Sequence, residues 1–434
     1  MQSGRRVAVV GLGSGGPAAA LFLEEQGHRV EVFEREPAPG PVGAGILLQP
    51  TGMAVLERLG LASLVRRRGA RIDRLHGQAA GGRTVMDLSY ADLDPALHGL
   101  GVHRGVLFAA LFDALRERPI EMRCGTPVVS LERQGAMTTL VDTRGDAHGP
   151  YDLVVLADGA RSALRAQMGI PVRRAARYPW AALWAVLPDV DGSFAGTLAQ
   201  VYRGTREMIG FLPTGYGPDD AGTPSVSLFW SLPTADGERW RQLGLDRLKK
   251  RMIALAPHAQ PLLDQIVYPS QLTFASYWDV RMPRWHAGGV ACIGDAGHAM
   301  SPQLGQGTNL ALMDAWILAR CIGARGEVPA ALEHYSHLRR AHLRYYGAAS
   351  RWLTPLFQSR LAPLGWGRDL FMRPATRVPP VRNLMLASLV GAKTGVFGRL
   401  PDDHLSAAHL SAAAGSPEPL TGDAPRGPAS VSAP

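Results

Sequence analysis

Near its start the chain carries the stretch Arg6-Val7-Ala8-Val9-Val10-Gly11-Leu12-Gly13-Ser14-Gly15-Gly16-Pro17. A short apolar run followed directly by spaced glycines is typical of a buried strand, a tight turn and a helix that packs back against the strand. The pattern predicts a strand over 6–10, an amphipathic helix over 18–27 and a second strand over 29–33 that ends at Glu34. A unit of this kind holds the pyrophosphate of a dinucleotide.

The glycines of this turn have separate tasks in the prediction. Gly11 allows the tight turn, Gly13 lets the backbone approach the phosphates, and Gly16 lets helix and strand pack closely. The free N–H groups and partial positive charge of the helix start favour the pyrophosphate, and an acidic residue about twenty positions on accepts hydrogen bonds from the ribose. The predicted contacts are Gly11, Gly13, Ser14, Gly15, Gly16, Glu34 and Arg35. The alternative is an ordinary glycine-rich turn in an α/β domain.

Composition limits the class of protein. A chain of 434 residues is long enough for two or three domains, and 46% hydrophobic residues with a balanced hydropathy predict a soluble globular protein. No apolar run is long enough for an integral membrane segment. Arg5-Arg6 could suggest a twin-arginine signal, but the predicted strand follows at once and no cleavage site does. We therefore interpret the N-terminus as mature and the protein as cytoplasmic.

The cysteines and the charge exclude other classes. Cys124, Cys292 and Cys321 are far apart, which argues against a disulfide framework, a metal site or a redox pair. The net charge is +9, but the arginines are scattered instead of forming a basic stripe interleaved with aromatic residues. We expect no nucleic-acid partner, and at most a modest attraction of an anionic cofactor or substrate.

Two further strands end in a glycine–aspartate pair. The apolar run 151–157 leads to Asp158-Gly159, and the run 289–293 leads to Gly294-Asp295. Continuous apolar runs are typical of strands in a parallel sheet that is covered on both faces. A loop rich in glycine, proline and glutamine follows the second pair, and a long helix is expected from about Thr308.

The region between these strands has a different character. It contains tryptophans and alternating runs such as 198–202 and 226–232, which predict a mainly antiparallel sheet with one helix over 245–256. Most of the tryptophans should lie in the core, with one or two lining a cavity. We predict an α/β fold with a discontinuous Rossmann-like dinucleotide-binding domain (1–70, 101–170 and 286–330), an inserted substrate-binding β-sheet domain (71–100 and 171–285), a C-terminal helical region (331–404) and a disordered tail (405–434).

Taken in order, Gly11-x-Gly13-x-x-Gly16, Asp158-Gly159 and Gly294-Asp295 resemble the fingerprints of the FAD-dependent aromatic hydroxylases. These are group A flavoprotein monooxygenases of the p-hydroxybenzoate hydroxylase fold. The resemblance covers roughly residues 5–400, and the segments 178–184 and 353–359 look closer to the ubiquinone-biosynthesis hydroxylase branch.

The resemblance implies where the cofactor FAD lies. Asp295 would accept hydrogen bonds from the ribityl chain, and the loop 301–309 would run beside the isoalloxazine ring. The helix from Thr308 would point its positive end at N1 and O2 of the flavin. The implied catalytic residues are Pro302, Gly305, Gln306, Gly307 and Thr308. Further cofactor contacts are Gly45, Arg104, Asp158, Gly159, Gly294, Asp295 and Asn309, although Asp158 could instead cap a helix and Arg104 could form a surface ion pair.

The resemblance also implies a reaction. NADPH or NADH, docking transiently, would reduce FAD; O2 would then add at flavin C4a to give a hydroperoxide that hydroxylates a small aromatic or polyketide-like substrate of secondary metabolism. No side-chain base stands out among 13 histidines and 10 tyrosines. A monomer or homodimer is expected. The alternatives are an FAD-dependent dehydrogenase or reductase of the same fold, and a flavin-binding protein without catalysis.

Several motifs of related flavoproteins are missing. There is no second G-x-G-x-x-G and no redox cysteine pair, which argues against the disulfide reductases. The Trp-x-Trp-x-Ile-Pro motif and the lysine of flavin halogenases are also missing. Gly43-Ala44-Gly45 stands where p-hydroxybenzoate hydroxylase has an arginine before its Ala–Gly pair, so that enzyme's substrate and NADPH contacts do not carry over. We expect the apolar residues of 352–366 to pack on the FAD domain; a lid over the cavity and a weak peripheral membrane contact are alternatives.

Overall fold

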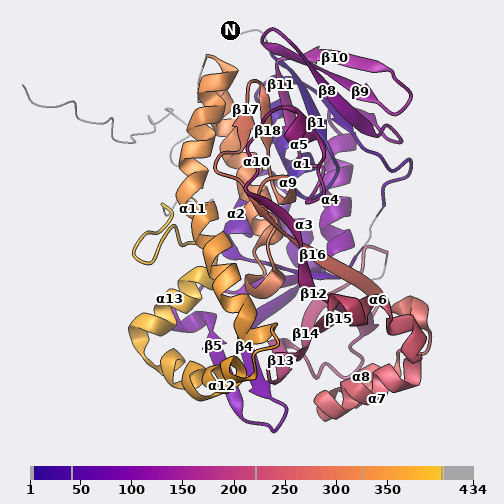
Figure 1. Ribbon diagram of the computed structural model, residues 1–434, viewed down its shortest axis with the longest axis vertical. Helices are drawn as coiled ribbons and strands as arrows, with labels where there is room; N and C mark the ends of the chain where they lie inside the picture. Colours follow the sequence, from indigo (N-terminus) through magenta and orange to yellow (C-terminus); the bar gives the residue numbers. More distant parts are fainter. Residues whose placement is uncertain (1–3, 41–42, 220–221, 325, 402–403, 405–434) are drawn as a thin grey trace, which may run out of the picture.

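The computed structural model describes residues 4–401 and 404, except 41–42, 220–221 and 325. The tail predicted at 405–434 lies outside these residues. Two large sheets lie one above the other in Figure 1, and the 30-residue helix α11 (Val328–Phe357) runs past both. At 1.5 Å per residue this helix is about 45 Å long.

The upper sheet is the predicted dinucleotide-binding unit. Its six strands have the order β17-β18-β11-β1-β2-β7, and all neighbours are parallel except β17 and β18. Its central strands are almost entirely buried, which explains their continuous apolar sequences. The bounds are β1 (Arg6–Val10), β2 (Arg29–Phe33), β7 (Glu121–Arg123), β11 (Leu153–Leu156), β17 (His286–Ala287) and β18 (Val290–Cys292).

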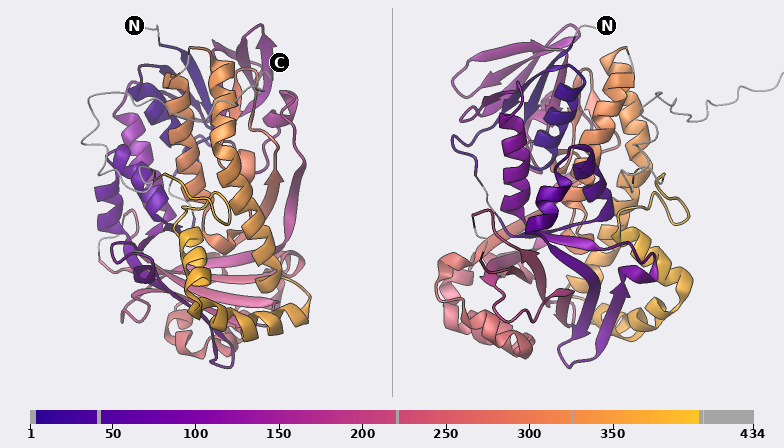
Figure 2. Two further views of the ribbon diagram at one scale, coloured as in Figure 1. Left: turned by 90° about the vertical axis from the view of Figure 1, so that its left-hand side faces the viewer. Right: turned by 180° about the vertical axis from the view of Figure 1, so that it is seen from behind.

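Helices and a small sheet cover this unit. The helices α1 (Gly15–Glu25) and α10 (Gly307–Ala324) pack against each other, and Figure 2 shows α10 beside α11. The small sheet shares the core and contains β8 (Val128–Gln134), β9 (Met137–Asp142) and β10 (Ala147–Tyr151). The other helices of the dinucleotide-binding unit are α2 (Pro50–Arg58), α3 (Ala62–Arg68), α4 (Arg104–Arg116) and α5 (Leu164–Gln167). Helix α1 begins three residues before the predicted start, because Pro17 fits the first helical turn, where its missing N–H is not needed.

The lower sheet is mainly antiparallel, as predicted. Eight strands follow the order β16-β12-β15-β14-β13-β4-β6-β3, β5 pairs with β4, and only β13 and β4 are parallel. The bounds are β3 (Gly45–Leu48), β4 (Ala70–Ala79), β5 (Thr84–Ser89), β6 (Gly99–His103), β12 (Arg174–Pro188), β13 (Gly196–Arg203), β14 (Glu207–Gly215), β15 (Ser225–Pro233) and β16 (Thr273–Arg281). Strands β3 and β6 thus join this sheet to the first and second segments of the proposed FAD-binding domain.

Alternation along the strands of the lower sheet separates its two faces. On β12, Leu183 packs in a core with helix α7 (Leu245–Leu255), while its neighbour Trp184 lines a cavity on the opposite face. On β15, Trp230 belongs to the same core and Phe229 lines the same cavity. Successive side chains of a strand point to opposite faces, so this alternation builds the core and the cavity from the same segments.

The C-terminal helices cover the cavity face of the lower sheet. Helix α12 (Ala362–Arg377) packs on β5, and Leu386 and Leu389 of α13 (Pro379–Leu389) enter a core with residues of the sheet. The prediction that the apolar residues of 352–366 pack on the FAD-binding domain is wrong. Leu353, Leu356 and Phe357 pack with residues of β5, β13 and β14 instead, and Trp352, Leu361 and Trp366 are exposed. No helix in the described part of the chain is both long and apolar enough to cross a membrane.

Candidate functional site

The glycine turn after β1 has two glycines that the protein itself requires. Gly11 has a φ of +106°, and a Cβ there would lie 2.5 Å from the carbonyl oxygen of Ala157. A Cβ on Gly16 would lie 2.0 Å from the carbonyl oxygen of Gly11, so helix α1 could not approach the turn. These contacts match the roles predicted for both residues.

Gly13 is different, because nothing in the protein fills the space beside it. A Cβ at Gly13 would find only the carbonyl oxygen of Ala157, at 4.0 Å, and the residue is exposed. Ser14, next to it, makes no side-chain cap to α1. The open space lies over the N-terminal turn of α1, where N–H groups are free to bind an anion.

Glu34 and Arg35 follow β2, at the edge of the turn. The carboxylate of Glu34 accepts hydrogen bonds from the backbone N–H groups of Leu12 at 2.8 Å and Glu36 at 3.0 Å. Arg35 is 66% exposed and pairs with Glu36 at 3.3 Å. Glu34 therefore braces the glycine turn, and its contact with a ribose stays a prediction.

Asp158 stands at the carboxyl end of β11, next to Gly11. Its Oδ1 is buried and has no hydrogen-bond partner among the described residues. Burial raises the pKa of this carboxyl group. A buried polar atom without a partner is rare and points to a ligand that supplies the missing hydrogen bond.

The turn Gly294-Asp295 rests on a buried charge network that the sequence analysis missed. Gly294 has a φ of +56°, and its N–H donates to Oδ2 of Asp314 at 2.9 Å. Asp314 also contacts Nε2 of His298 at 2.5 Å and accepts from Nε of Arg339 at 2.7 Å. Burial acts to raise the pKa of Asp314, but the charges of His298 and Arg339 outweigh it and hold that pKa far below its usual range. The signal for this network was a single carboxylate inside the apolar helix α10.

Asp295 is the first residue of the short helix α9 (Asp295–His298). It is exposed and lines the main cavity. The predicted catalytic residues Pro302, Gly305, Gln306, Gly307 and Thr308 line the same cavity, as do Gly45 and Arg104. Segments far apart in the chain thus meet at one site. Gly307 and Thr308 form the first turn of α10, so the positive end of this helix faces the cavity.

Asn309 ties neighbouring segments together at the start of α10. Its amide is buried; Oδ1 accepts from the N–H of Gln49 at 2.8 Å, and Nδ2 donates to the carbonyl oxygens of Leu47 at 3.0 Å and Gly305 at 3.1 Å. The side chain therefore ties β3 to the loop before α10. We assign Asn309 to positioning this loop, and a direct contact with a cofactor stays untested.

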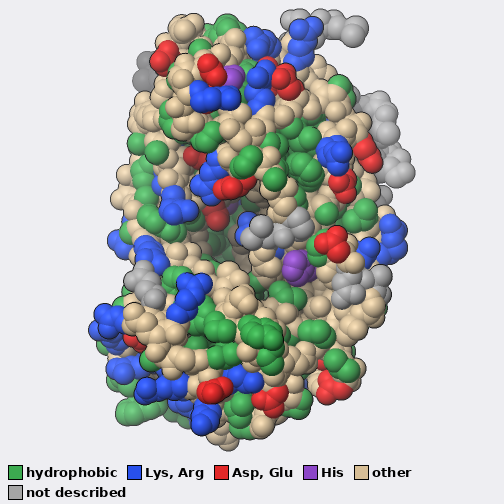
Figure 3. Space-filling view, turned by 90° about the vertical axis from the view of Figure 1, so that its right-hand side faces the viewer, with side chains coloured by type: hydrophobic (Ala, Val, Ile, Leu, Met, Phe, Trp, Pro, Cys, Tyr) green, Lys and Arg blue, Asp and Glu red, His purple; other side chains and the backbone are tan. Residues whose placement is uncertain are grey.

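The main cavity has a volume of about 740 Å³ and reaches from this loop to the lower sheet. The face drawn in Figure 3 is hollowed between its upper part, which holds the six-stranded sheet, and its lower part, which holds the larger sheet. The lower sheet forms one wall of the main cavity, and the C-terminal helices form another. The side chains that these walls contribute are apolar or uncharged: Trp184, Leu198, Met208, Leu212, Phe229, Tyr277, Leu353, Phe357, Met372 and Met385. The prediction that one or two tryptophans of the inserted region line a cavity is confirmed by Trp184.

These residues fit an extended dinucleotide cofactor. The open space at Gly13 and the unpartnered Oδ1 of Asp158 lie beside the turn after β1. In the lining of the main cavity, Nε2 of Gln303 is buried and is likewise without a partner in the part of the chain that the structure describes. The fold and the site together define a dinucleotide-binding α/β protein with a second, cavity-forming sheet.

Comparison with known proteins gives the family. The sequence matches the family described as "FAD binding domain" over residues 5–346, so the chain belongs to that family. It is 31% identical to a 6-methylpretetramide 4-monooxygenase of Streptomyces rimosus, over 71% of this chain and 73% of that protein. It is 29% identical to a 6-hydroxynicotinate 3-monooxygenase of Pseudomonas fluorescens, over 74% of this chain and 83% of the relative.

A solved structure confirms the p-hydroxybenzoate hydroxylase fold. Klebsiella pneumoniae HpxO, complexed with FAD and uric acid, superposes with a TM-score of 0.75 at 22% identity and covers 91% of this chain and 99% of its own. With the family match, the relatives identify the chain as an FAD-dependent monooxygenase. FAD is thus its cofactor.

Replacing Asp295 with alanine should weaken FAD retention about tenfold or more, because the change removes a charged hydrogen-bond acceptor from the cavity. The fold should be unaffected, since this carboxylate is exposed and starts a helix of only four residues. The measurement is the flavin absorbance per protein after gel filtration, with the exposed Asp113→Asn on α4 as the control. Unchanged flavin content would remove Asp295 from the site.

Proposed function

We propose that this monooxygenase hydroxylates a bulky, uncharged aromatic or polyketide-like substrate, with NADPH or NADH as the reductant. One observation carries the proposal: among the described residues, Arg104 and Asp295 are the only charged side chains that line the main cavity, and both are predicted FAD contacts. A small aromatic acid would bury its carboxylate without a partner, which is strongly unfavourable. Large apolar surfaces, by contrast, are favoured by the leucines, methionines and aromatic residues of the lower sheet.

One of the two relatives is named for a substrate of the proposed class, and the other is named for a small aromatic acid. The Streptomyces rimosus relative is named for a pretetramide substrate, and the Pseudomonas fluorescens relative is named for a hydroxylated nicotinate. Both names describe monooxygenases. We prefer the first class for this chain, because among the described residues no cationic side chain of the lower sheet or the C-terminal helices lines the cavity.

Different parts of the chain have different roles around the cofactor. FAD, when bound, supplies the chemistry of hydride acceptance and oxygen activation. The first turn of α10, at Gly307 and Thr308, offers its positive end to negative charge that develops at the ring. The apolar walls from the lower sheet and α11 to α13 exclude water from the reacting atoms.

Tyr277 is the polar group that we expect to orient the substrate. Its hydroxyl lies at the cavity and accepts a hydrogen bond from Nε1 of Trp184 at 3.1 Å. Burial raises the pKa of Tyr277 to about 12, so the phenol stays protonated at neutral pH. Its O–H group can therefore donate a hydrogen bond to an acceptor on the substrate. A carbonyl or phenol oxygen of the substrate is the fitting acceptor.

Tyr277→Phe should lower kcat/KM for a phenolic substrate about tenfold, the effect of losing one hydrogen bond in a buried site. FAD content and the rate of uncoupled NADPH oxidation should stay unchanged, because the ring remains in place. Steady-state kinetics on the variant and the wild type measure both. Equal kcat/KM values would exclude Tyr277 from substrate orientation.

The substrate class is tested with a panel of paired compounds. Polycyclic phenols and enols are compared with small hydroxybenzoates and hydroxynicotinates in an assay that records NADPH oxidation and oxygenated product. We expect product from the polycyclic compounds and little from the acids. Efficient hydroxylation of the small acids would contradict the proposal.

A further inference from the structure

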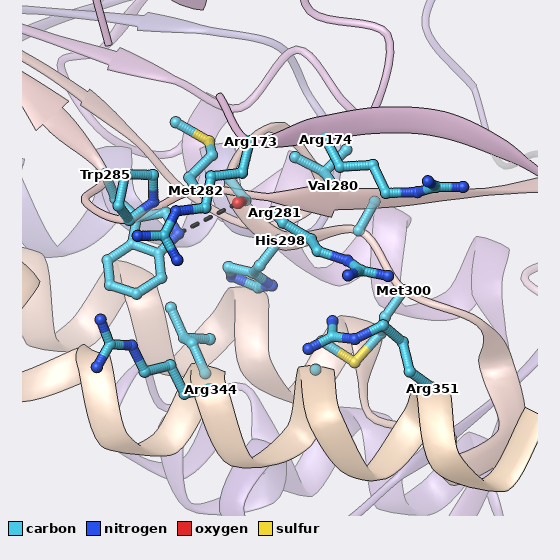
Figure 4. A pocket seen from close by; sticks show the side chains of 15 residues that line it. Arg173, Arg174, Val280, Arg281, Met282, Trp285, His298, Met300, Arg344 and Arg351 are labelled. Carbon is cyan, nitrogen blue, oxygen red and sulfur yellow. Dashed lines mark hydrogen bonds between the residues drawn. The ribbon is translucent and has the colours of Figure 1, made fainter. Parts of the chain in front are cut away.

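A second cavity is lined by five arginines, whereas the main cavity is lined mostly by apolar and uncharged residues. Its volume is about 430 Å³. Arg174 and Arg281 lie at the ends of β12 and β16, and Arg173 directly precedes β12. Arg344 and Arg351 come from α11 on the opposite side. Figure 4 shows Arg173 and Arg281 extending from the strands toward Arg344 and Arg351, with His298 behind them. We call this cavity the arginine cleft.

The positive charge of the arginine cleft is poorly compensated. Asp279, buried beside the cleft, pairs with Arg174 at 3.0 Å and Arg281 at 2.6 Å, and it lies 3.8 Å from Arg351. One carboxylate thus serves three guanidinium groups. Arg173 and Arg344 have no side-chain hydrogen bond or ion pair to any described residue.

The chemistry of the cleft suits phosphate groups. Guanidinium groups form bidentate hydrogen bonds with phosphate and remain charged at every physiological pH. A cleft of this volume holds more than one phosphate, and Met282, Trp285 and Leu343 add an apolar wall. His298 does not add a free charge, because its Nε2 is engaged by Asp314.

The cleft adjoins the main cavity. Met300 lines both cavities, and the segment that it belongs to leads directly into the loop before α10. The N–H of Val280, in the wall of the cleft, donates to the carbonyl oxygen of Ala299 at 2.9 Å, which fixes β16 to this segment. A ligand held by its phosphates in the cleft would therefore have its other end close to the flavin side of the main cavity.

We propose that the arginine cleft binds the phosphate groups of the nicotinamide dinucleotide that reduces the enzyme. The inference rests on the proposed function, which requires this reductant, and on the sequence, whose single glycine-rich dinucleotide turn serves FAD. The charge of the cleft favours NADPH over NADH, because the 2′-phosphate adds negative charge.

The test uses 2′,5′-ADP, a fragment of NADPH that carries its 2′-phosphate and one phosphate of its pyrophosphate and cannot reduce a flavin. Its binding to the holoenzyme is measured by calorimetry, with inorganic phosphate as the comparison ligand. We expect Arg173→Gln and Arg344→Gln each to weaken binding about tenfold, and the double variant to weaken it further. The control is Arg116→Gln, an exposed arginine in the last turn of α4 that makes the same change of charge elsewhere.

The same variants separate the reductant from other anions. The KM for NADPH should rise in parallel with the dissociation constant, while the flavin content, the kcat at saturating NADPH and the KM for the aromatic substrate stay as in the control. Unchanged binding of 2′,5′-ADP in the double variant would overturn the proposal. So would equal affinity for inorganic phosphate, or a rise in the KM for the aromatic substrate in place of that for NADPH. If the wild type binds 2′,5′-ADP but never oxidises NADPH, the proposed function fails and not the assignment of the cleft.

Discussion

Replacing Gly13 with alanine should reduce FAD affinity at least about tenfold, or about 1.4 kcal/mol, without lowering the stability of the apoprotein. The reason is that the added methyl group would meet no protein atom closer than 4.0 Å and would instead occupy the space left for the pyrophosphate. Fluorescence titration of the apoprotein with FAD measures the affinity, and urea unfolding measures the stability.

Gly16→Ala is the matched comparison, because its methyl group would lie 2.0 Å from a backbone oxygen of the protein. This variant should lose stability as well as FAD, since α1 must shift away from β1. If Gly13→Ala bound FAD as tightly as the wild type, the turn would not be a pyrophosphate site. If both variants were destabilised equally, the open space at Gly13 would not be evidence for a cofactor-binding site.

Replacing Asp314 with asparagine should lower the free energy of unfolding by about 3–5 kcal/mol, the usual effect of removing one partner from a buried ion pair. The change leaves Arg339, only 2% exposed, without its carboxylate and removes the charged acceptor of the Gly294 N–H. The exposed Asp113→Asn should change stability by less than about 0.5 kcal/mol. Urea unfolding of both variants at neutral pH measures the difference, and a small effect for Asp314 would contradict the network.

The same residue predicts a pH dependence. The pKa of Asp314 is held well below its unfolded-state value of about 4, so the unfolded chain binds more protons there at acid pH. Its stabilising contribution is therefore complete above about pH 5 and declines as the pH falls toward the folded-state pKa. The stability difference between wild type and Asp314→Asn should shrink between about pH 5 and pH 3. A constant difference over this range would contradict the assignment of the shift to Asp314.

The sequence predicted the FAD half of the molecule well, because its signals are local. The glycine turn after β1 and the pairs Asp158-Gly159 and Gly294-Asp295 each end a buried strand, and parallel strands bring their carboxyl ends to one edge. A motif of this kind needs only its own neighbours in sequence to be recognised. The family and the monooxygenase class followed from it and agree with the comparisons.

The substrate half could not be predicted in the same way. Trp184, Phe229 and Tyr277 meet only because β12, β15 and β16 pair in a register that single-sequence patterns do not give. The docking of α12 and α13 on the lower sheet likewise depends on which apolar face finds which partner. The arginine cleft combines residues more than 160 positions apart in the sequence, such as Arg173 and Arg344.

Coupled oxygenation of a substrate by the FAD-loaded protein is the central activity that we propose. The direct measurement is turnover of a polycyclic phenol under ¹⁸O2 with NADPH, with the product followed by mass spectrometry and NADPH consumption recorded in parallel. We expect a product that carries one ¹⁸O atom and forms in proportion to the NADPH consumed. The substrate should also stimulate the rate of NADPH consumption. NADPH oxidation that ignores the substrate and gives no labelled product, or a purified protein that takes up no FAD, would contradict the proposed activity.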